Sequence, residues 1–104
     1  MFFIIWEYHV RAEYSAAFEE VYSATGAWAK LFQKSKDYLG TELLCDVENS
    51  LRYLTIDRWT SAQEYASFLA EWKNEYEDLD AQCDPFAEKE SLVGKWKTAS
   101  SEIR

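Results

Sequence analysis

The N-terminal segment is the most continuously apolar part of the chain. Residues 2–10 are apolar or aromatic except for Glu7 and His9. A run of this kind, without helical spacing, is typical of a strand that is covered on both faces. We therefore expect the chain to begin with a central strand of a sheet.

Two longer segments carry apolar residues at intervals of three and four, which is the spacing of one face of a helix. The first covers about residues 13–35 and contains Gly26, which is expected to bend or divide the helix. The second opens with Ser61 and Glu64, the pair of a capping box, and ends at Pro85. The two apolar stripes are Phe18, Val21, Tyr22, Thr25, Trp28, Ala29 and Phe32, and then Tyr65, Phe68, Leu69, Trp72, Tyr76 and Leu79.

Three further segments, residues 41–47, 51–59 and 91–97, are expected to be strands. The polar residues 48–50 predict the turn of a hairpin between the first two. The order is then β-α-β-β-α-β, the ferredoxin-like α+β unit, in a single domain over residues 1–104. Right-handed crossovers place two helices on one face of a four-stranded antiparallel sheet. Residues 98–104 are expected to form a polar tail.

The other face of this sheet would be left without helices. Alternation along the first strand directs its even-numbered residues to the helices and leaves Phe3 and Ile5 on the open face. We expect the third strand to add Leu51, Tyr53 and Trp59 to that face. Such a strongly apolar exposed face favours association with another protein. The same face of a second copy of the chain would bury it symmetrically. We therefore expect a homodimer formed through the open sheet face.

The net charge of the chain makes some classes of binding partner unfavourable. The chain has 19 acidic and 11 basic residues, a net charge of −8. Such a protein repels phosphate backbones and anionic lipids, so we expect no nucleic-acid partner and no membrane partner. The N-terminal apolar run stops at Glu7 and follows no basic residues, which makes it too short for a signal sequence or a membrane span. A cytoplasmic protein is expected.

Metal and cofactor motifs are not evident in the sequence. The spacing of histidine, cysteine and carboxylate residues matches no metal site, and the 3 glycines form no phosphate-binding loop. Cys45 and Cys83 are expected to be small buried apolar residues rather than a redox pair. We expect neither a metal nor a cofactor.

Four short stretches of the sequence are similar to those of one known family. They are residues 40–44 (GTELL), residues 53–61 (YLTIDRWTS), residues 26–28 before Leu31-Phe32, and Tyr76 before Leu79-Asp80 and Cys83. Together these stretches resemble the antibiotic-biosynthesis-monooxygenase-like domains of the dimeric α/β barrel superfamily. The resemblance covers nearly the whole chain and implies a ferredoxin-like monomer whose sheet pairs with a partner's sheet to form a barrel.

The resemblance also implies a range of activities. Some members oxidise aromatic polyketides with O2 and use neither metal nor flavin, and others degrade haem or quinone-like compounds. The haem-degrading branch uses an asparagine on the first strand, with a tryptophan and a histidine on the second helix. This chain has Tyr8 and Phe68 at the matching positions and no histidine in the second helix. That departure weighs against haem cleavage.

Cofactor-free oxygenation requires a base for the acidic proton of the substrate and donors for the oxyanion that develops. His9 is the only histidine in the chain, and an unperturbed histidine side chain can serve as a base near neutral pH. Antiparallel pairing of the first and third strands is expected to gather Glu7, His9, Tyr53, Thr55 and Asp57 on the barrel-facing side. The candidate catalytic residues are Tyr8, His9, Tyr53 and Asp57. The same polar group could instead be a network that fixes the register of the dimer.

Aromatic residues between the sheet and the helices could either line a pocket or simply fill the core. The candidate pocket residues are Trp6, Tyr22, Trp28, Phe68 and Trp72. Two functions remain open. The first is a cofactor-independent monooxygenase acting on an aromatic or quinol-like small molecule, which needs the pocket. The alternative is a non-catalytic dimeric small-molecule-binding or accessory protein of the same fold, and an accessory module is expected to have a filled core.

Overall fold

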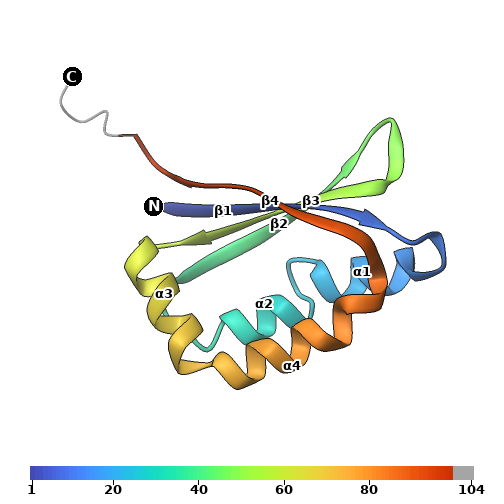
Figure 1. Ribbon diagram of the computed structural model, residues 1–104. Coiled ribbons are helices and arrows are strands. Elements are labelled where there is room, and N and C mark those ends of the chain that lie inside the picture. The colour runs from blue at the N-terminus through green and yellow to red at the C-terminus, as the bar shows by residue number, and fades with distance from the viewer. Residues whose placement is uncertain (100–104) are drawn as a thin grey trace.

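The computed structural model describes residues 1–99 and has four strands in one antiparallel sheet, with the helices on one face (Figure 1). The strands are β1 (Phe2–Val10), β2 (Tyr38–Asp46), β3 (Asn49–Trp59) and β4 (Ala87–Lys97), in the order β2-β3-β1-β4. The predicted ferredoxin-like α+β fold is confirmed. The predicted polar tail lies outside the described residues from residue 100 onward.

Each of the two predicted helices is divided. The first becomes η1 (Ala12–Tyr14), α1 (Ser15–Tyr22) and α2 (Ala27–Phe32), and the second becomes α3 (Ala62–Glu71), α4 (Lys73–Cys83) and η2 (Asp84–Phe86). Gly26 allows the first division because a Cβ atom there would lie 2.3 Å from the carbonyl oxygens of Glu20 and Val21. Thr25 is exposed beside it, so its predicted place in the apolar stripe is wrong.

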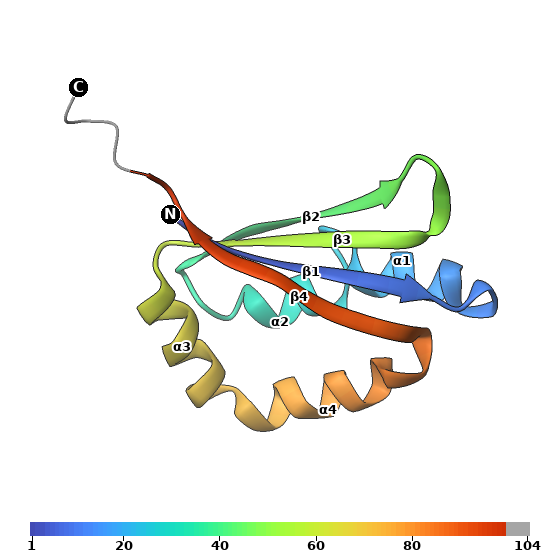
Figure 2. The ribbon, with the colours of Figure 1, turned by 45° about the horizontal axis from the view of Figure 1, so that its top comes forward.

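The second division was not predicted. Trp72 leaves helical geometry, with φ −109° and ψ 30°, and α3 and α4 run in different directions in Figure 2. The capping box at the start of α3 is present, since the Ser61 hydroxyl accepts a hydrogen bond from the Glu64 N–H at 3.1 Å. No helix within residues 1–99 is long and apolar enough to cross a membrane.

β1 has the predicted bounds, whereas β2, β3 and β4 begin earlier than the sequence pattern predicted. β2 begins at Tyr38 and β4 at Ala87, because backbone hydrogen bonds continue a ladder whatever the side chains are. The hairpin turn falls at Val47 and Glu48, and Val47 is 98% exposed. Cys83 is buried as expected, whereas Cys45 near this turn is exposed.

The core between the sheet and the helices is largely aromatic. Trp59 and Phe18 are fully buried, and Tyr53 is 3% exposed. The ring of Trp59 lies 5.2 to 5.4 Å, between centroids, from the rings of four neighbours. The expectation that Tyr53 and Trp59 lie on the open face of the sheet is therefore wrong.

The register between β1 and β3 differs by one residue from the register that would gather Glu7, His9, Tyr53, Thr55 and Asp57 on one face. Even-numbered residues of β1 pair with odd-numbered residues of β3 along the whole ladder. Paired residues of antiparallel strands share a face, so a slip of one residue moves every side chain to the other side. Tyr53, Thr55 and Asp57 therefore face the helices, whereas Glu7 and His9 lie on the open face. The expected polar group of these five residues does not form.

Candidate functional site

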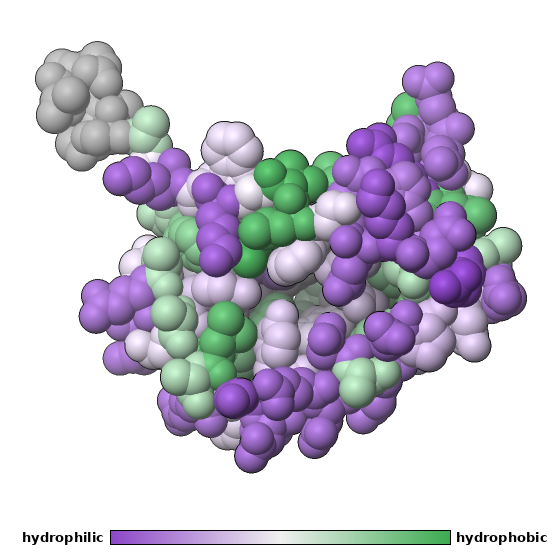
Figure 3. All heavy atoms as spheres, in the orientation of Figure 1, coloured by the Kyte–Doolittle hydropathy of each residue, from purple (hydrophilic) through white to green (hydrophobic). Residues whose placement is uncertain are grey.

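A cavity of about 150 Å³ lies between the sheet and the helices. Figure 3 shows the surface hollowed between these two layers. A cavity of this volume accommodates about one benzene ring. Its Trp and Tyr side chains are Trp6, Tyr8, Tyr22, Trp28, Tyr65 and Tyr76, and its polar ones are Thr41, Thr55, Asp57, Asp80 and Glu90. The aromatic residues thus fill most of the core but leave one ligand-sized space, so the filled core expected of an accessory module is not found.

Asp57 is the most deeply buried carboxylate in the cavity wall. It lies on β3, is 9% exposed, and accepts a hydrogen bond from the Thr41 hydroxyl of β2 at 2.5 Å. The Tyr38 hydroxyl lies 2.5 Å from the same Thr41 oxygen. Because Thr41 gives its single hydroxyl hydrogen to Asp57, Tyr38 is the donor to Thr41. The three residues form a chain of hydrogen bonds that ends on the carboxylate.

The pKa of Asp57 follows from this environment. Burial raises the pKa from 3.8 to about 6, and the hydrogen bond from Thr41 opposes that rise. No basic side chain among the cavity-lining residues offsets the effect of burial. A carboxylate with a pKa near 6 is mostly ionised at neutral pH and binds a proton more readily than an ordinary aspartate. It is therefore suited to act as a general base.

Two buried polar atoms of residues that line the cavity form no hydrogen bond of ordinary length and angle within residues 1–99. They are Thr55 Oγ1 and Trp28 Nε1, and their residues are 3% and 8% exposed. An unpaired buried donor costs roughly 1–3 kcal/mol. Each of these two groups can donate a hydrogen bond to an acceptor oxygen of a ligand. Burial also raises the pKa of Tyr8, so its hydroxyl remains protonated and can donate as well.

The candidate catalytic residues divide into two sets. Tyr8 and Asp57 are part of the cavity wall. Tyr53 lies outside the wall, because its ring packs on Phe18 with centroids 4.8 Å apart and its hydroxyl donates to Glu19 at 2.5 Å. The two residues on the wall come from adjacent strands that carry the sheet side of the cavity.

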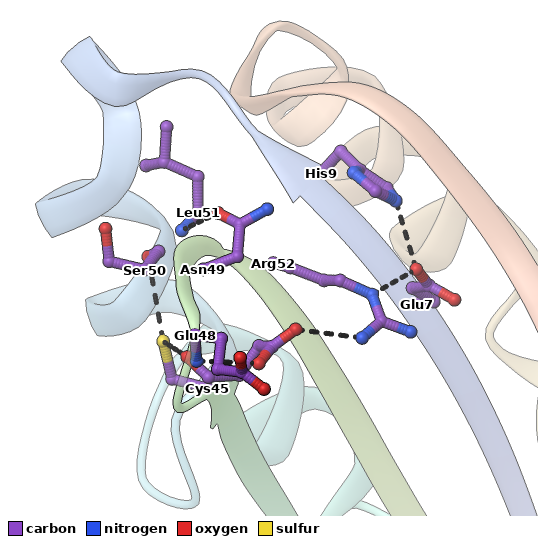
Figure 4. A network of polar contacts seen from close by, with 9 residues as sticks. Glu7, His9, Cys45, Glu48, Asn49, Ser50, Leu51 and Arg52 are labelled. Carbon is purple, nitrogen blue, oxygen red and sulfur yellow. Dashed lines mark hydrogen bonds and ion pairs between the residues drawn. The ribbon is translucent and has the colours of Figure 1, made fainter.

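By the register of β1 and β3, His9 lies on the opposite face of the sheet from the cavity, and Figure 4 shows it beside Glu7. Its Nε2 atom is 3.0 Å from Glu7 Oε2, which also accepts a hydrogen bond from Arg52 Nε at 2.7 Å. Arg52 donates to Asp46 as well, at 2.9 Å, and so links three strands. The Arg52 hydrogen bond holds the pKa of Glu7 below its usual value. This network stabilises the open face and has no contact with the cavity.

The candidate pocket residues are also divided. Trp6, Tyr22 and Trp28 line the cavity. Phe68 is 3% exposed and packs in the core, with its ring 5.2 Å from that of Trp59. Trp72 lies at the junction of α3 and α4, where the Lys34 ammonium is 4.9 Å from its ring centroid. Neither of these two residues belongs to the wall.

Sequence reasoning missed several residues of the wall. Thr41, Tyr65 and Tyr76 would follow from the correct strand register and from the helical stripe. Thr55, whose predicted place is in a polar group on the other face, would follow from the same register. Asp80 and Glu90 carry no such signal, because α4 and β4 bring them together across a connection that shows no motif.

Known proteins share features with this chain at the levels of sequence and fold. The family model described as antibiotic biosynthesis monooxygenase matches residues 1–72. No curated protein sequence matches the chain. A protein of the same family name from Deinococcus radiodurans has a TM-score of 0.74 and 13% identity, with 97% of this chain and 95% of that chain covered.

Two further solved structures are similar in fold. SnoaB, a cofactor-independent oxygenase from Streptomyces nogalater solved in a mutant form, has a TM-score of 0.72 and 18% identity, with 96% and 94% of the two chains covered. A conserved protein from Methanosarcina mazei has a TM-score of 0.71 and 8% identity, with 94% and 92% covered. At such identities the likeness shows the fold alone.

Proposed function

Because the chain belongs to the antibiotic biosynthesis monooxygenase family, we propose that it is a monooxygenase that oxidises an aromatic or quinol-like small molecule with O2. The observation that carries the proposal is Asp57, a buried carboxylate with a raised pKa in an aromatic cavity. The fold similarity to a protein named as a cofactor-independent oxygenase supports a reaction that uses neither metal nor flavin.

The proposed reaction begins with removal of a proton. Asp57 takes it from a phenolic hydroxyl or an acidic C–H group, and the substrate becomes an electron-rich anion that can reduce O2. For a hydroquinone, one oxygen atom enters the ring to give a hydroxyquinone, and the other leaves as water with two hydrogens of the substrate. The substrate supplies all the electrons, so the reaction needs no external reductant.

The anion requires hydrogen-bond donors that are already in place. Thr55 Oγ1 and Trp28 Nε1 belong to residues that line the cavity and form no hydrogen bond of ordinary length and angle within residues 1–99, and the Tyr8 hydroxyl is protonated there. Donors that are fixed before the reaction stabilise developing charge without having to reorganise. We assign these three groups to binding of the oxyanion. The aromatic rings around them exclude water and fit a flat ligand.

Oxygen uptake with a panel of anthrones and hydroquinones tests the function. We expect uptake above the rate of autoxidation with at least one compound, and an unchanged rate in the His9→Ala variant, because His9 lies on the other face of the sheet. Binding of these compounds without any uptake would favour the alternative, a non-catalytic small-molecule-binding protein.

The hydrogen bond from Thr41 to Asp57 predicts a shift in the pH profile. In the wild type, kcat/KM is expected to rise as pH increases through about 6, because ionised Asp57 is the active form. Thr41→Val removes the donor that stabilises the ionised form, so the rise should move to higher pH. Thr41→Ser keeps the hydroxyl and should keep the wild-type profile. A profile that is the same in all three proteins would contradict Asp57 as the base.

We also propose that the protein is a homodimer formed through the open sheet face. Phe3 and Ile5 of β1 lie on that face beside Arg58 and Ile56 of β3, with which they pair. Trp96 of β4, which is 54% exposed, pairs with Phe3. Figure 3 shows apolar side chains grouped on the surface of the sheet away from the helices. Symmetrical pairing of two such faces would remove them from water.

A charge at the centre of this face should prevent pairing. Ile5 lies on a central strand between Ile56 and Gly94, so Ile5→Lys is expected to convert a dimer to a monomer while the helix side of the sheet stays intact. Light scattering after size-exclusion chromatography measures the mass. Ala70→Glu, an exposed position on α3, serves as the control and should remain dimeric. A wild type that is monomeric at micromolar concentration would contradict the proposed dimer.

A further inference from the structure

The opening of the cavity carries two carboxylates. Asp80 of α4 and Glu90 of β4 line the cavity and are both exposed, so the opening lies between these two elements. Neither residue forms an ion pair within residues 1–99, where the salt bridges involve other carboxylates. Burial, together with the nearby charges of Asp80 and Asp84, raises the pKa of Glu90. The like charges at the opening therefore repel one another, and no basic side chain of residues 1–99 forms an ion pair with either of them.

The charged side chains that line the cavity are all acidic. With Asp57, three carboxylates and no basic side chain line the cavity. Lys89 lines a neighbouring hollow together with Asp80 and Glu90, and there Asp84 and Glu88 bring the carboxylates to four against one lysine. A ligand that bears a carboxylate or a phosphate would meet repulsion along the whole path, and a cation would be attracted to its mouth.

Aromatic side chains are present at the same opening. Trp6 and Tyr76 are only partly buried and line the cavity with Asp80 and Glu90. The face of an aromatic ring attracts an ammonium group, and carboxylates beside it add to that attraction. A mouth of rings and carboxylates is thus suited to an organic cation.

The inner wall of the cavity calls for a hydrogen-bond acceptor on the ligand rather than for a cation. Thr55 and Trp28, both more than nine-tenths buried, have polar atoms that form no hydrogen bond of ordinary length and angle within residues 1–99. The Trp28 N–H can only donate, and so it needs an acceptor such as a phenolic or carbonyl oxygen. This requirement is independent of the carboxylates at the mouth.

From these two ends of one cavity we infer that the substrate is a phenol or quinol that carries a protonated amine, with its oxygen held by Thr55 and Trp28 and its ammonium group between Asp80 and Glu90. This inference rests on the proposed function and narrows its substrate class. The ring lies between the two ends, in a space that accommodates about one benzene ring.

Three ligands with the same ring and similar chains test the inference. Tyramine carries an ammonium group, 4-ethylphenol carries no charge, and 3-(4-hydroxyphenyl)propionate carries a carboxylate. Calorimetric titration of the wild type at low salt should show tyramine binding about fivefold more tightly than 4-ethylphenol, since a partly exposed charge pair contributes about 1 kcal/mol. The carboxylate should bind most weakly. Equal affinities, or the reverse order, would overturn the inference.

Variants at the mouth identify the source of the preference. The double variant Asp80→Asn with Glu90→Gln should lower the affinity for tyramine to that for 4-ethylphenol and leave the affinity for 4-ethylphenol unchanged. Asp78→Asn, an exposed position on α4 outside the cavity wall, should retain the wild-type order. Retention of the tyramine preference in the double variant would overturn the assignment to this mouth.

Oxygen uptake separates this inference from the proposed function. Uptake with a neutral hydroquinone, combined with equal binding of the three ligands, would leave the oxygenase proposal standing and overturn the amine-bearing substrate. Selective tyramine binding that the double variant loses, combined with no uptake from any phenol or amine-bearing hydroquinone, would support the cation site and overturn the oxygenase proposal.

Discussion

Asp57→Asn is expected to lower kcat/KM by about 100- to 10,000-fold, the usual contribution of a general base. The amide keeps the size of the side chain and can still accept the hydrogen bond from Thr41, but it cannot take up the proton of the substrate. Steady-state oxygen uptake measures the loss. A variant within threefold of the wild type would remove Asp57 from the reaction.

The stability of this variant provides the control. The pKa of Asp57 in the folded protein is raised from 3.8 to about 6, so the folded state holds the proton more tightly than the unfolded state. The favourable contribution of protonated Asp57 to the free energy of folding is present below pH 4 and is lost as the pH rises through about 6. At pH 8 the buried charge costs about 3 kcal/mol, and Asp57→Asn should be at least as resistant to urea as the wild type. Loss of activity with retained stability then identifies a chemical role.

Trp59→Ala is expected to lower the free energy of unfolding by about 3–5 kcal/mol, the usual cost of truncating a buried aromatic residue. The side chain is fully buried and packs against Phe32, Tyr38, Tyr65 and Phe68. Since small domains have about 5–15 kcal/mol in total, this variant should be close to unfolding. Urea denaturation followed by circular dichroism measures the difference.

Trp59→Phe is the matched variant for this position. Its ring keeps most of the contacts, and the Trp59 Nε1 atom that is lost has no hydrogen-bond partner within residues 1–99. The cost should therefore be much smaller than for alanine. A loss below 1 kcal/mol for Trp59→Ala would contradict the central place of this residue in the core.

The fold could be predicted from the sequence because its signals are local. The spacing of apolar residues distinguishes the helices from the strands, and Gly26 is a visible point of division. The break at Trp72 has no such sign, since the apolar stripe runs from Phe68 through Trp72 to Tyr76 with constant spacing and without a glycine or proline between them.

The site could be predicted only in part because β3 has an unusual pattern. Its helix-facing positions include Thr55 and Asp57, whereas its open face includes Leu54 and Ile56. Alternation alone would direct the polar side chains toward solvent. The structure instead buries them in the wall of a cavity, which reverses the ordinary pattern. The residue type alone makes His9 a candidate base. Its position on the face away from the cavity follows only from the register between β1 and β3.

Labelling with ¹⁸O2 tests the central claim most directly. A phenol or hydroquinone that supports uptake is incubated under ¹⁸O2 with the wild type and with Asp57→Asn, and the product is analysed by mass spectrometry. The account predicts one labelled oxygen atom in each product molecule formed by the wild type and labelled product near the background level with the variant. Equal labelling by the two proteins, or wild-type product without label, would contradict it.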